Sequence, residues 1–233
     1  MTVALPEDVQ IAMKKPKQIF GKYVLVKELG RGGFGVVYKA WQHELRRYVA
    51  IKFLLGAAGE DELKRFYREA QLAASLSHPN VAAIHEISVQ DGKHFIAMEF
   101  VDGYGLERVR APKSRVELLQ VVAFLRDAAR GVDYAHSKGV IHRDLKPANI
   151  MARKDGKVCV MDFGLARKVK DDLKITGTGD VVGTPAYMSP EQARAEVEKI
   201  DRSTDVYSLG ATLYDLLTGR PPFVAESVVA LLL

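Results

Sequence analysis

Apolar residues in the first hundred positions recur mostly in short runs of the kind that form β-strands. These runs are rich in valine, tyrosine and isoleucine and are separated by glycine or polar turn residues, which predicts strands joined by hairpins. After the third run, apolar residues between positions 60 and 76 follow helical spacing, and His78-Pro79-Asn80 ends that helix. The expected strands are 23–26, 36–40, 48–53, 81–87 and 94–101. The pattern predicts a five-stranded antiparallel sheet with one helix.

From residue 102 onward the apolar spacing changes to that of helices. Segments 117–136 and 203–217 are long and periodic, and a long irregular stretch, 164–190, lies between them. A loop of that length inside a compact domain is usually functional. We therefore expect an α+β fold with an N-terminal extension or short capping segment at 1–19, a β-rich lobe at 20–101 and a helical lobe at 102–233. The cleft between two such lobes is the natural place for a ligand.

Composition narrows the class of protein. The chain is 48% hydrophobic and 27% charged, which is typical of a soluble globular domain and excludes fibrous or disordered classes. No apolar stretch is long enough to span a membrane, no secretory signal opens the chain, and Cys159 stands alone, which together favour a cytoplasmic location. A membrane anchor would have to lie outside this chain. The net charge of +5 is spread among acidic residues, so we expect no nucleic-acid partner.

A glycine cluster is the first candidate for chemistry. The residues from Gly30 to Val37 fit G-x-G-x-x-G-x-V, which alone could be only a tight hairpin. A dinucleotide site would need a helix after the glycines, whereas a strand follows here. That context favours a hairpin whose backbone N–H groups cover the phosphates of a nucleotide. Lys52, on the next strand, is either a solvated charge or a phosphate ligand held by Glu69 of the predicted helix.

The most specific signal is His142-Arg143-Asp144-Leu145-Lys146-Pro147-Ala148-Asn149, which is far too long to match by chance. Asp162-Phe163-Gly164 follows, and Ser189-Pro190-Glu191 stands where Ala-Pro-Glu is usual. The chain thus resembles the catalytic domain of protein kinases. The sequence from Gly183 to Ala193 is similar to that of the bacterial branch of this family. The motifs occur in the order typical of that family across residues 24–223.

The resemblance implies the roles of the chemical residues. Asp144 would accept or orient the proton of the substrate hydroxyl, and Lys146, typical of serine/threonine kinases, would steady the transferred phosphate. Asn149 and Asp162 would bind Mg²⁺, and Lys52, positioned by Glu69, would reach the phosphates of ATP. Asp205 would hydrogen-bond the backbone of the catalytic loop. The remaining residues expected around ATP are Leu29, Gly30, Gly32, Gly33, Gly35, Val37, Ala50, Met98, Glu99, Val101 and Met151.

The resemblance also implies regulation by phosphate. Thr176 and Thr178 stand at the spacing of paired activation-loop phosphosites, and Arg143 would pair with a phosphate there. The expected substrates are proteins with serine or threonine acceptors, and a homodimer could phosphorylate its own loops. The alternative is a pseudokinase that binds partners with little turnover; it would normally lack Lys52, Asp144 or Asp162, all of which are present.

The last residues suggest a missing segment. The chain stops in the apolar run 228–233, and the arginine that holds Glu191 in this family would come later. We expect the helical lobe to lack its last helices and Glu191 to be a buried carboxylate without its partner.

Overall fold

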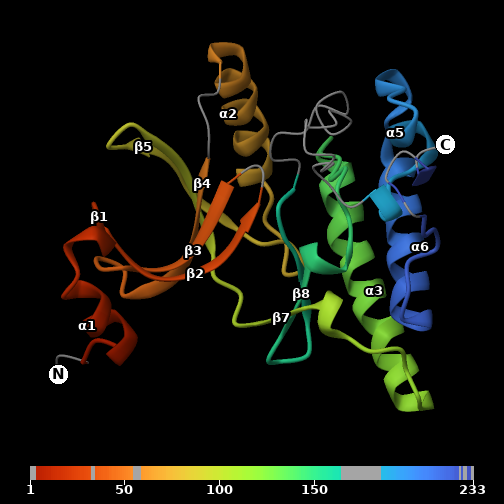
Figure 1. The fold of residues 1–233 in the computed structure, drawn as a ribbon, viewed down its shortest axis with the longest axis horizontal. Helices are drawn as coiled ribbons and strands as arrows, with labels where there is room; N and C mark the ends of the chain where they lie inside the picture. The colour runs from red at the N-terminus through yellow and green to blue at the C-terminus, as the bar shows by residue number, and fades with distance from the viewer. Residues whose placement is uncertain are drawn as a thin grey trace. The chain divides into compact units, whose positions relative to one another are not determined.

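A computed structural model describes residues 4–32, 35–54, 59–163, 185–225, 227 and 230–231 (Figure 1). The chain divides into two compact units. Met1–Ala74 and Ala83–Val101 form the first, and Ser75–Ala82 and Asp102–Leu233 form the second. The short segment 75–82 thus packs with the second unit, where Asn80 Nδ2 donates to the Val158 carbonyl at 2.8 Å. The lobe boundaries expected from the sequence stay predictions.

The first unit is built on an antiparallel sheet of six strands in the order β1-β2-β3-β4-β6-β5. The strands are β1 Ile19–Phe20, β2 Tyr23–Gly32, β3 Gly35–Gln42, β4 Arg47–Leu54, β5 Ile84–Gln90 and β6 Lys93–Glu99. Sequence analysis expected five and missed β1, which pairs with the start of β2 across a turn. Gly21 makes that turn possible, because its φ of +52° lies in the left-handed region.

One face of this sheet carries an aromatic core. Phe20, Tyr23, Phe53 and Phe95 are buried there together with Ile51. The Phe20 ring meets Phe53 and Phe95 edge to face, with centroids 4.9 and 5.2 Å apart. Because side chains alternate along a strand, Ala50 and Lys52 of β4 must face the other side of the sheet.

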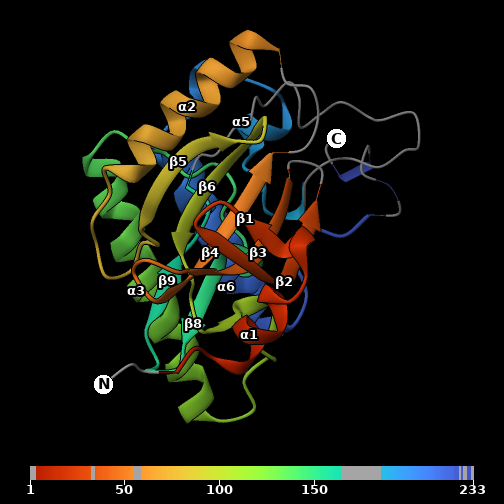
Figure 2. The same cartoon turned by 90° about the vertical axis from the view of Figure 1, so that its left-hand side faces the viewer.

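Residues 1–19, expected as an extension, contribute a helix to the first unit. In α1, Glu7–Met13, the buried Val9 and Ala12 pack with Val24 and Trp41 of the sheet. Asp8 adds polar contacts: its carboxylate accepts from Lys39 Nζ at 2.8 Å and from the Tyr48 hydroxyl at 2.5 Å. A one-turn helix, η1 Pro16–Gln18, then leads into β1. Figure 2 shows α1 beside β2.

The predicted helix after β4 is present as α2, Glu60–Ala74. Phe66, Ala70 and Ala73 are buried, as expected from their helical spacing. The helix packs against β5, as Figure 2 also shows.

The second unit is organised by two helices that pack on each other, α3 Arg115–Ser137 and α6 Arg202–Thr218. Gly219 ends α6 with a φ of +77°. A three-stranded sheet, in the order β7 Gly103–Gly105, β8 Ile150–Arg153 and β9 Val158–Val160, packs through β9 on α3. Shorter elements are η2 Leu106–Arg108, η3 Pro147–Asn149, η4 Pro185–Tyr187, α5 Pro190–Ala193 and η5 Val197–Lys199.

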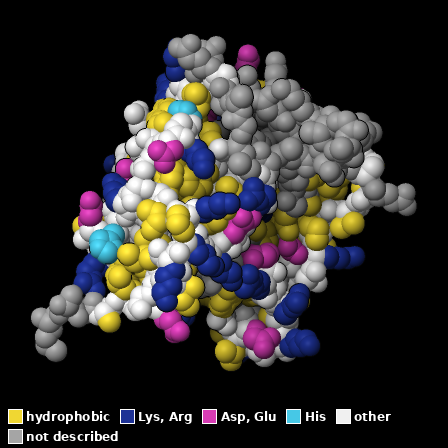
Figure 3. All heavy atoms as spheres, turned by 60° about the vertical axis from the view of Figure 1, so that its left-hand side comes forward, with side chains coloured by type: hydrophobic (Ala, Val, Ile, Leu, Met, Phe, Trp, Pro, Cys, Tyr) yellow, Lys and Arg dark blue, Asp and Glu magenta, His cyan; other side chains and the backbone are white. Residues whose placement is uncertain are grey.

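Three further features are a buried thiol, the distribution of surface charges and the length of the helices. The Cys159 thiol on β9 is buried. On the face drawn in Figure 3, lysine and arginine side chains lie in several groups among hydrophobic and acidic ones. Among the described helices, none is both long and apolar enough to cross a membrane.

Candidate active site

The second unit brings three of the predicted catalytic side chains together. Lys146 Nζ lies 3.2 Å from Asp144 Oδ2. The Asn149 amide nitrogen donates to Asp144 Oδ2 at 2.9 Å and to the Asp144 carbonyl at 2.7 Å. Asn149 belongs to η3, and Lys146 is the residue that caps this turn. The carboxylate of Asp144 is thereby held between a cation and an amide.

Asp205 fixes the backbone that carries these groups. This residue lies in the first turn of α6, and its side chain is 0% exposed. Its carboxylate accepts from the backbone N–H groups of His142 and Arg143, each at 2.8 Å. His136 Nε2, from the last turn of α3, lies 2.7 Å from the same carboxylate. Arg143 has a φ of +66°, an uncommon conformation that surrounding bonds must stabilise.

The ionisation of Asp205 follows from these contacts. Burial would raise the pKa of its carboxyl, but the hydrogen bond with His136 and those from the loop backbone outweigh burial, and the pKa lies below its ordinary value. Asp205 is therefore a buried anion at neutral pH, with donors on both oxygens.

Asp162 lies next to Asn149 through the backbone. The Met161 N–H donates to the Asn149 carbonyl at 2.8 Å, and His142 Nε2 lies 2.8 Å from the Met161 carbonyl. The ring of Phe163 packs on His142 with centroids 4.7 Å apart. Asp162 itself has a φ of +56°. Such strained residues cluster at functional sites.

The residues present fit a magnesium ion. The hydrogen bonds that Asn149 donates use its amide nitrogen, so its amide oxygen is the atom that can meet a cation, together with the Asp162 carboxylate. Hard oxygen ligands of this kind suit Mg²⁺, which usually takes only one or two protein groups and completes its shell with phosphates and water. Among the described residues, no group of three or more His, Cys, Asp or Glu side chains forms a metal cluster.

A second polar connection ties the candidate catalytic loop, residues 142–149, to α5. Gln192 Nε2 donates to the Arg143 carbonyl at 2.7 Å. Ser189 and Gln192 form a capping box at the start of α5, because each side chain bonds the backbone of the other. The Nε of Arg143 is buried and has no hydrogen-bond partner within the described part of the chain.

The expectation of an unpartnered, buried carboxylate at Glu191 is wrong. Glu191 is only half-buried, and its Oε1 accepts from the Thr204 hydroxyl at 2.5 Å. Burial would raise the pKa of Glu191, but the bonds from Thr204 and Ser189 outweigh it and lower the pKa. The Thr204 hydroxyl thus stabilises this carboxylate.

In the first unit, four of the predicted ATP-binding residues share one face of the sheet. Lys52 on β4 stands opposite Val37 on β3, and Ala50 stands opposite Met98 on β6. Directly paired residues and residues two apart along a strand point to the same side, so all four face away from the aromatic core. Ala50 and Met98 are buried, and Lys52 and Val37 are half-buried.

The glycine hairpin shows two kinds of glycine. A Cβ on Gly30 or Gly32 would meet no described atom within 4 Å, so the space beside the backbone of these two glycines is open. A Cβ on Gly35 would instead collide with the backbone carbonyl of Phe53, so only glycine fits beside β4. Leu29, in the same hairpin, is exposed.

The other predicted site residues are placed as follows. Glu69 is half-buried on α2, Glu99 ends β6, Val101 is buried, and Met151 is half-buried on β8. An ion pair between Lys52 and Glu69 stays a prediction. Gly33, Thr176 and Thr178 lie outside the described residues.

Sequence reasoning missed three supporting residues: His136, Gln192 and Thr204. Gln192 had a readable signal, because Ser189-x-x-Gln192 is a capping-box pattern. His136 and Thr204 had none, since each meets its partner only through the packing of α3, α5 and α6.

Comparison with known sequences agrees with this geometry. The protein kinase domain family matches residues 23–230. Because this match covers most of the sequence, the chain belongs to the protein kinase domain family. The predicted resemblance and the α+β kinase fold are thereby confirmed.

Bacterial proteins are among the relatives. The serine/threonine-protein kinase PknB of Mycobacterium leprae is 40% identical over 224 residues, 94% of this chain and 36% of the relative. A probable serine/threonine-protein kinase of Streptomyces coelicolor is also 40% identical, over 94% of this chain and 33% of its own length. One from Clostridium acetobutylicum is 37% identical over 91% of this chain and 32% of its own length. The chain thus spans about a third of the length of these relatives.

Proposed function

We propose that this chain is a serine/threonine protein kinase domain that transfers the γ-phosphoryl group of ATP to serine and threonine hydroxyls of proteins. The observation that carries the proposal is the grouping of Asp144, Lys146 and Asn149 on one backbone-anchored loop. The names of the bacterial relatives support the choice of serine and threonine as acceptors.

The residues divide the chemistry between them. The substrate hydroxyl attacks the γ-phosphorus, the bond to the β-phosphate oxygen breaks, and ADP leaves while the hydroxyl proton passes to Asp144. Asn149 orients the Asp144 carboxylate, and Lys146 is close enough to Asp144 to reach the transferred phosphate as well. A positioned base of this kind contributes roughly 10²–10⁴-fold in rate. Asp162 and Asn149 would hold magnesium, which would supply neutralising charge at the phosphates.

The first unit would bind the nucleotide itself. The open positions at Gly30 and Gly32 let backbone N–H groups approach phosphates, and Lys52 lies on the same sheet face as Val37, Ala50 and Met98. We propose that this face receives the adenine and that Lys52 reaches the phosphate oxygens.

The decisive experiment is Asp144→Asn with radiolabelled ATP and a generic acceptor protein. We expect transfer to fall at least about 100-fold while nucleotide binding persists, because Lys52, Asp162 and the sheet face are unchanged. Asp155→Asn, the same change in the exposed β8–β9 turn, should leave transfer unchanged. Turnover of the Asp144 variant within threefold of the parent would contradict the role of Asp144. Nucleotide binding without transfer in the parent would favour the pseudokinase alternative.

Autophosphorylation is the second part of the proposal. The buried Arg143 Nε, which lacks a partner among the described residues, supports a role for Arg143 in receiving a phosphate. Mass spectrometry after incubation with ATP should find phosphate on Thr176 or Thr178. Full activity of the double variant Thr176→Ala/Thr178→Ala would argue against regulation at these positions.

A further inference from the structure

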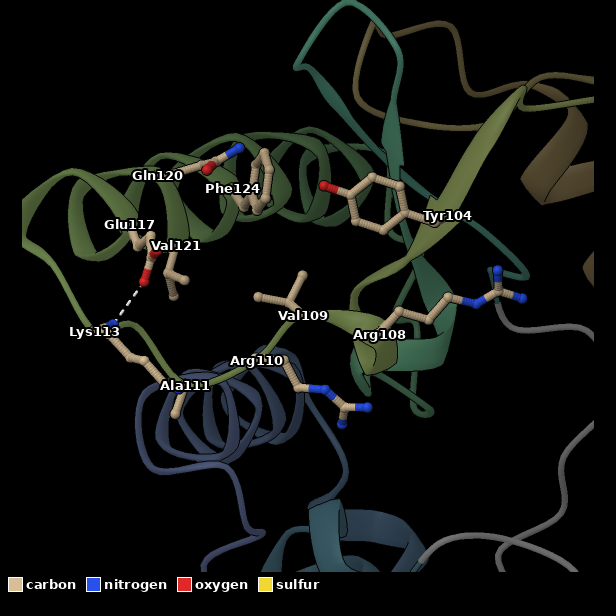
Figure 4. A pocket seen from close by; sticks show the side chains of 10 residues that line it. All are labelled: Tyr104, Arg108, Val109, Arg110, Ala111, Lys113, Glu117, Gln120, Val121 and Phe124. Atoms are coloured by element: carbon tan, nitrogen blue, oxygen red, sulfur yellow. Dashed lines mark hydrogen bonds between the residues drawn. The ribbon is translucent and has the colours of Figure 1, made fainter.

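A pocket outside the proposed catalytic site lies within the second unit (Figure 4). It has a volume of about 460 Å³ and is bordered by Tyr104 of β7, the segment 108–113 and the first turns of α3. None of the roles proposed above uses it.

The centre of this pocket is apolar. Val109 lies between η2 and α3, and Val121 and Phe124 face it from α3. Figure 4 shows the Tyr104 ring pointing from β7 toward Phe124. Tyr104 is 40% exposed, whereas Val121 and Phe124 are buried. Such a centre suits an apolar side chain of a few carbon atoms.

The border of the pocket is cationic. Arg108, Arg110 and Lys113 line it, against a single carboxylate, Glu117. Glu117 Oε2 already accepts from the Lys113 backbone N–H at 2.6 Å. Arg108 Nε lies 3.6 Å from exposed Glu107, and no ion pair joins Arg110 or Lys113 to any carboxylate in the described part of the chain. The border therefore has an excess of positive charge.

The pocket lies close to the candidate catalytic loop, because elements that border each of them pack together. Arg108 is the last residue of η2, and η2 packs against η3, the turn that ends at Asn149. A peptide held by the pocket would thus remain attached beside the loop that carries Asp144.

We propose that this pocket docks an acidic segment of protein substrates, with one apolar side chain in the centre and flanking carboxylates on Arg108, Arg110 and Lys113. The substrate aspect of this inference rests on the proposed kinase function. Opposite charge around an apolar anchor gives specificity and faster association, and its effect falls with rising salt. The occupant is an unmodified peptide rich in Asp and Glu.

The test uses two synthetic peptides that share one serine acceptor and a flexible linker. The first ends in a leucine flanked by aspartates and glutamates, and the second has asparagine and glutamine in their place. Fluorescence anisotropy measures binding without turnover, and radiolabelled ATP measures KM and kcat separately. We expect tighter binding and a lower KM for the acidic peptide, with a difference that shrinks at high salt.

The variant that isolates the pocket is Arg110→Glu/Lys113→Glu. It should raise the Kd and KM for the acidic peptide about tenfold and leave kcat unchanged, since exposed charges each change affinity only severalfold. Arg130→Glu, which changes another exposed arginine in the second half of α3, should leave both values unchanged. Thermal unfolding checks that each variant folds, and the milder Arg110→Gln/Lys113→Gln replaces the reversal if it does not.

The outcomes separate docking from catalysis. Charge-dependent binding of the acidic peptide that is lost in the double variant supports the pocket even if no transfer is seen, in which case the kinase proposal fails alone. Equal binding of both peptides, or loss of binding in Arg130→Glu as large as in the double variant, overturns the docking proposal. A phosphorylated version of the neutral peptide that binds more tightly than the acidic one also overturns it in favour of a phosphate site.

Discussion

The two units keep their candidate site residues in place by different means. In the first unit, Lys52 lies on a strand of the sheet, and aromatic rings packed edge to face, such as Phe20 and Phe53, stabilise the opposite face of that sheet. In the second, Asp144 stands on an irregular loop, and the carboxylate of Asp205 holds the backbone of that loop. Apolar packing tolerates gradual change, whereas a buried anion with donors on both oxygens does not.

This difference predicts the relative size of mutational effects. Loss of part of the aromatic core should weaken the first unit in proportion to the contacts removed. Loss of the Asp205 carboxylate should leave several buried donors without an acceptor in one step. The four predictions below test this contrast, from the largest expected effect to the smallest.

Asp205→Ala should be the most damaging change. It removes the acceptor of two backbone N–H groups and the partner of His136, so we expect a loss of about 3–5 kcal/mol in the free energy of unfolding. Phosphoryl transfer should fall with it, because Arg143 no longer has support for its positive φ. Denaturant unfolding and the radiolabel assay measure the two effects.

Asp205→Asn provides the graded comparison, since it keeps the size of the side chain and one accepting oxygen. It should lie between the parent and Asp205→Ala in stability. An Asp205→Ala protein whose free energy of unfolding stays within about 1 kcal/mol of the parent, the size of one ordinary hydrogen bond, would show that the loop does not depend on this carboxylate.

Elements of the fold with a local sequence pattern could be predicted, whereas elements that form only through pairing or packing could not. Strand alternation in Val49-Ala50-Ile51-Lys52-Phe53 and helical spacing up to Leu76 are local signals, and the elements formed where expected. The two residues of β1 were missed, because so short a strand has no pattern and exists only through pairing with β2. The sequence likewise does not predict the helix α1, since two buried side chains are too few to show periodicity.

The candidate site could be predicted from the sequence where it lies on a contiguous motif, and could not be predicted where it depends on packing. His142 through Asn149 is one stretch of chain, so its residues could be named from sequence. His136 and Asp205 are 69 residues apart, and no local pattern pairs them. The contact between Thr204 and Glu191 was unreadable for a similar reason, because a hydroxyl on α6 becomes a partner of a residue on α5 only once the chain has folded.

Phe95→Leu tests the apolar half of the comparison. The substitution keeps much of the volume but removes the edge contacts with Phe20 and Tyr23, so we expect a loss of about 1.5 kcal/mol. Hydrogen exchange should speed up in the strands of the first unit and not in the catalytic loop. Exchange that rises equally in both units would show that they unfold together and would weaken the contrast.

Gln192→Ala tests the polar half with a neutral group. It removes the donor to the Arg143 carbonyl and one side of the capping box, and it should cost about 1 kcal/mol in the free energy of unfolding. Arg194→Ala is a suitable control on the same segment, because the side chain of Arg194 is exposed. Denaturant unfolding compares the two variants. An equal loss of unfolding free energy in both would show that the contacts of Gln192 do not stabilise the fold.

Asp8→Asn should have the smallest effect and a distinctive pH dependence. Burial would raise the pKa of Asp8, but the bonds from Lys39 and Tyr48 outweigh it and hold the pKa below its ordinary value of 3.8. A lowered pKa in the folded state means that ionised Asp8 stabilises the fold above about pH 4 and that this stability is lost as the pH falls through the folded-state pKa. Since the side chain of Asp8 is 39% exposed, solvent screening limits the gain to about 0.5 kcal/mol at pH 7.

Urea unfolding at a series of pH values measures this contribution of Asp8. The difference in the free energy of unfolding between parent and Asp8→Asn should shrink as the pH is lowered from about 7 toward about 3, because the parent carboxylate becomes protonated. Glu7→Gln, on the exposed side of the same helix, should show a smaller difference at neutral pH. A gap for Asp8→Asn that widens in acid would show that the carboxylate does not secure α1, and the polar contacts of the first unit would then contribute less than its apolar core.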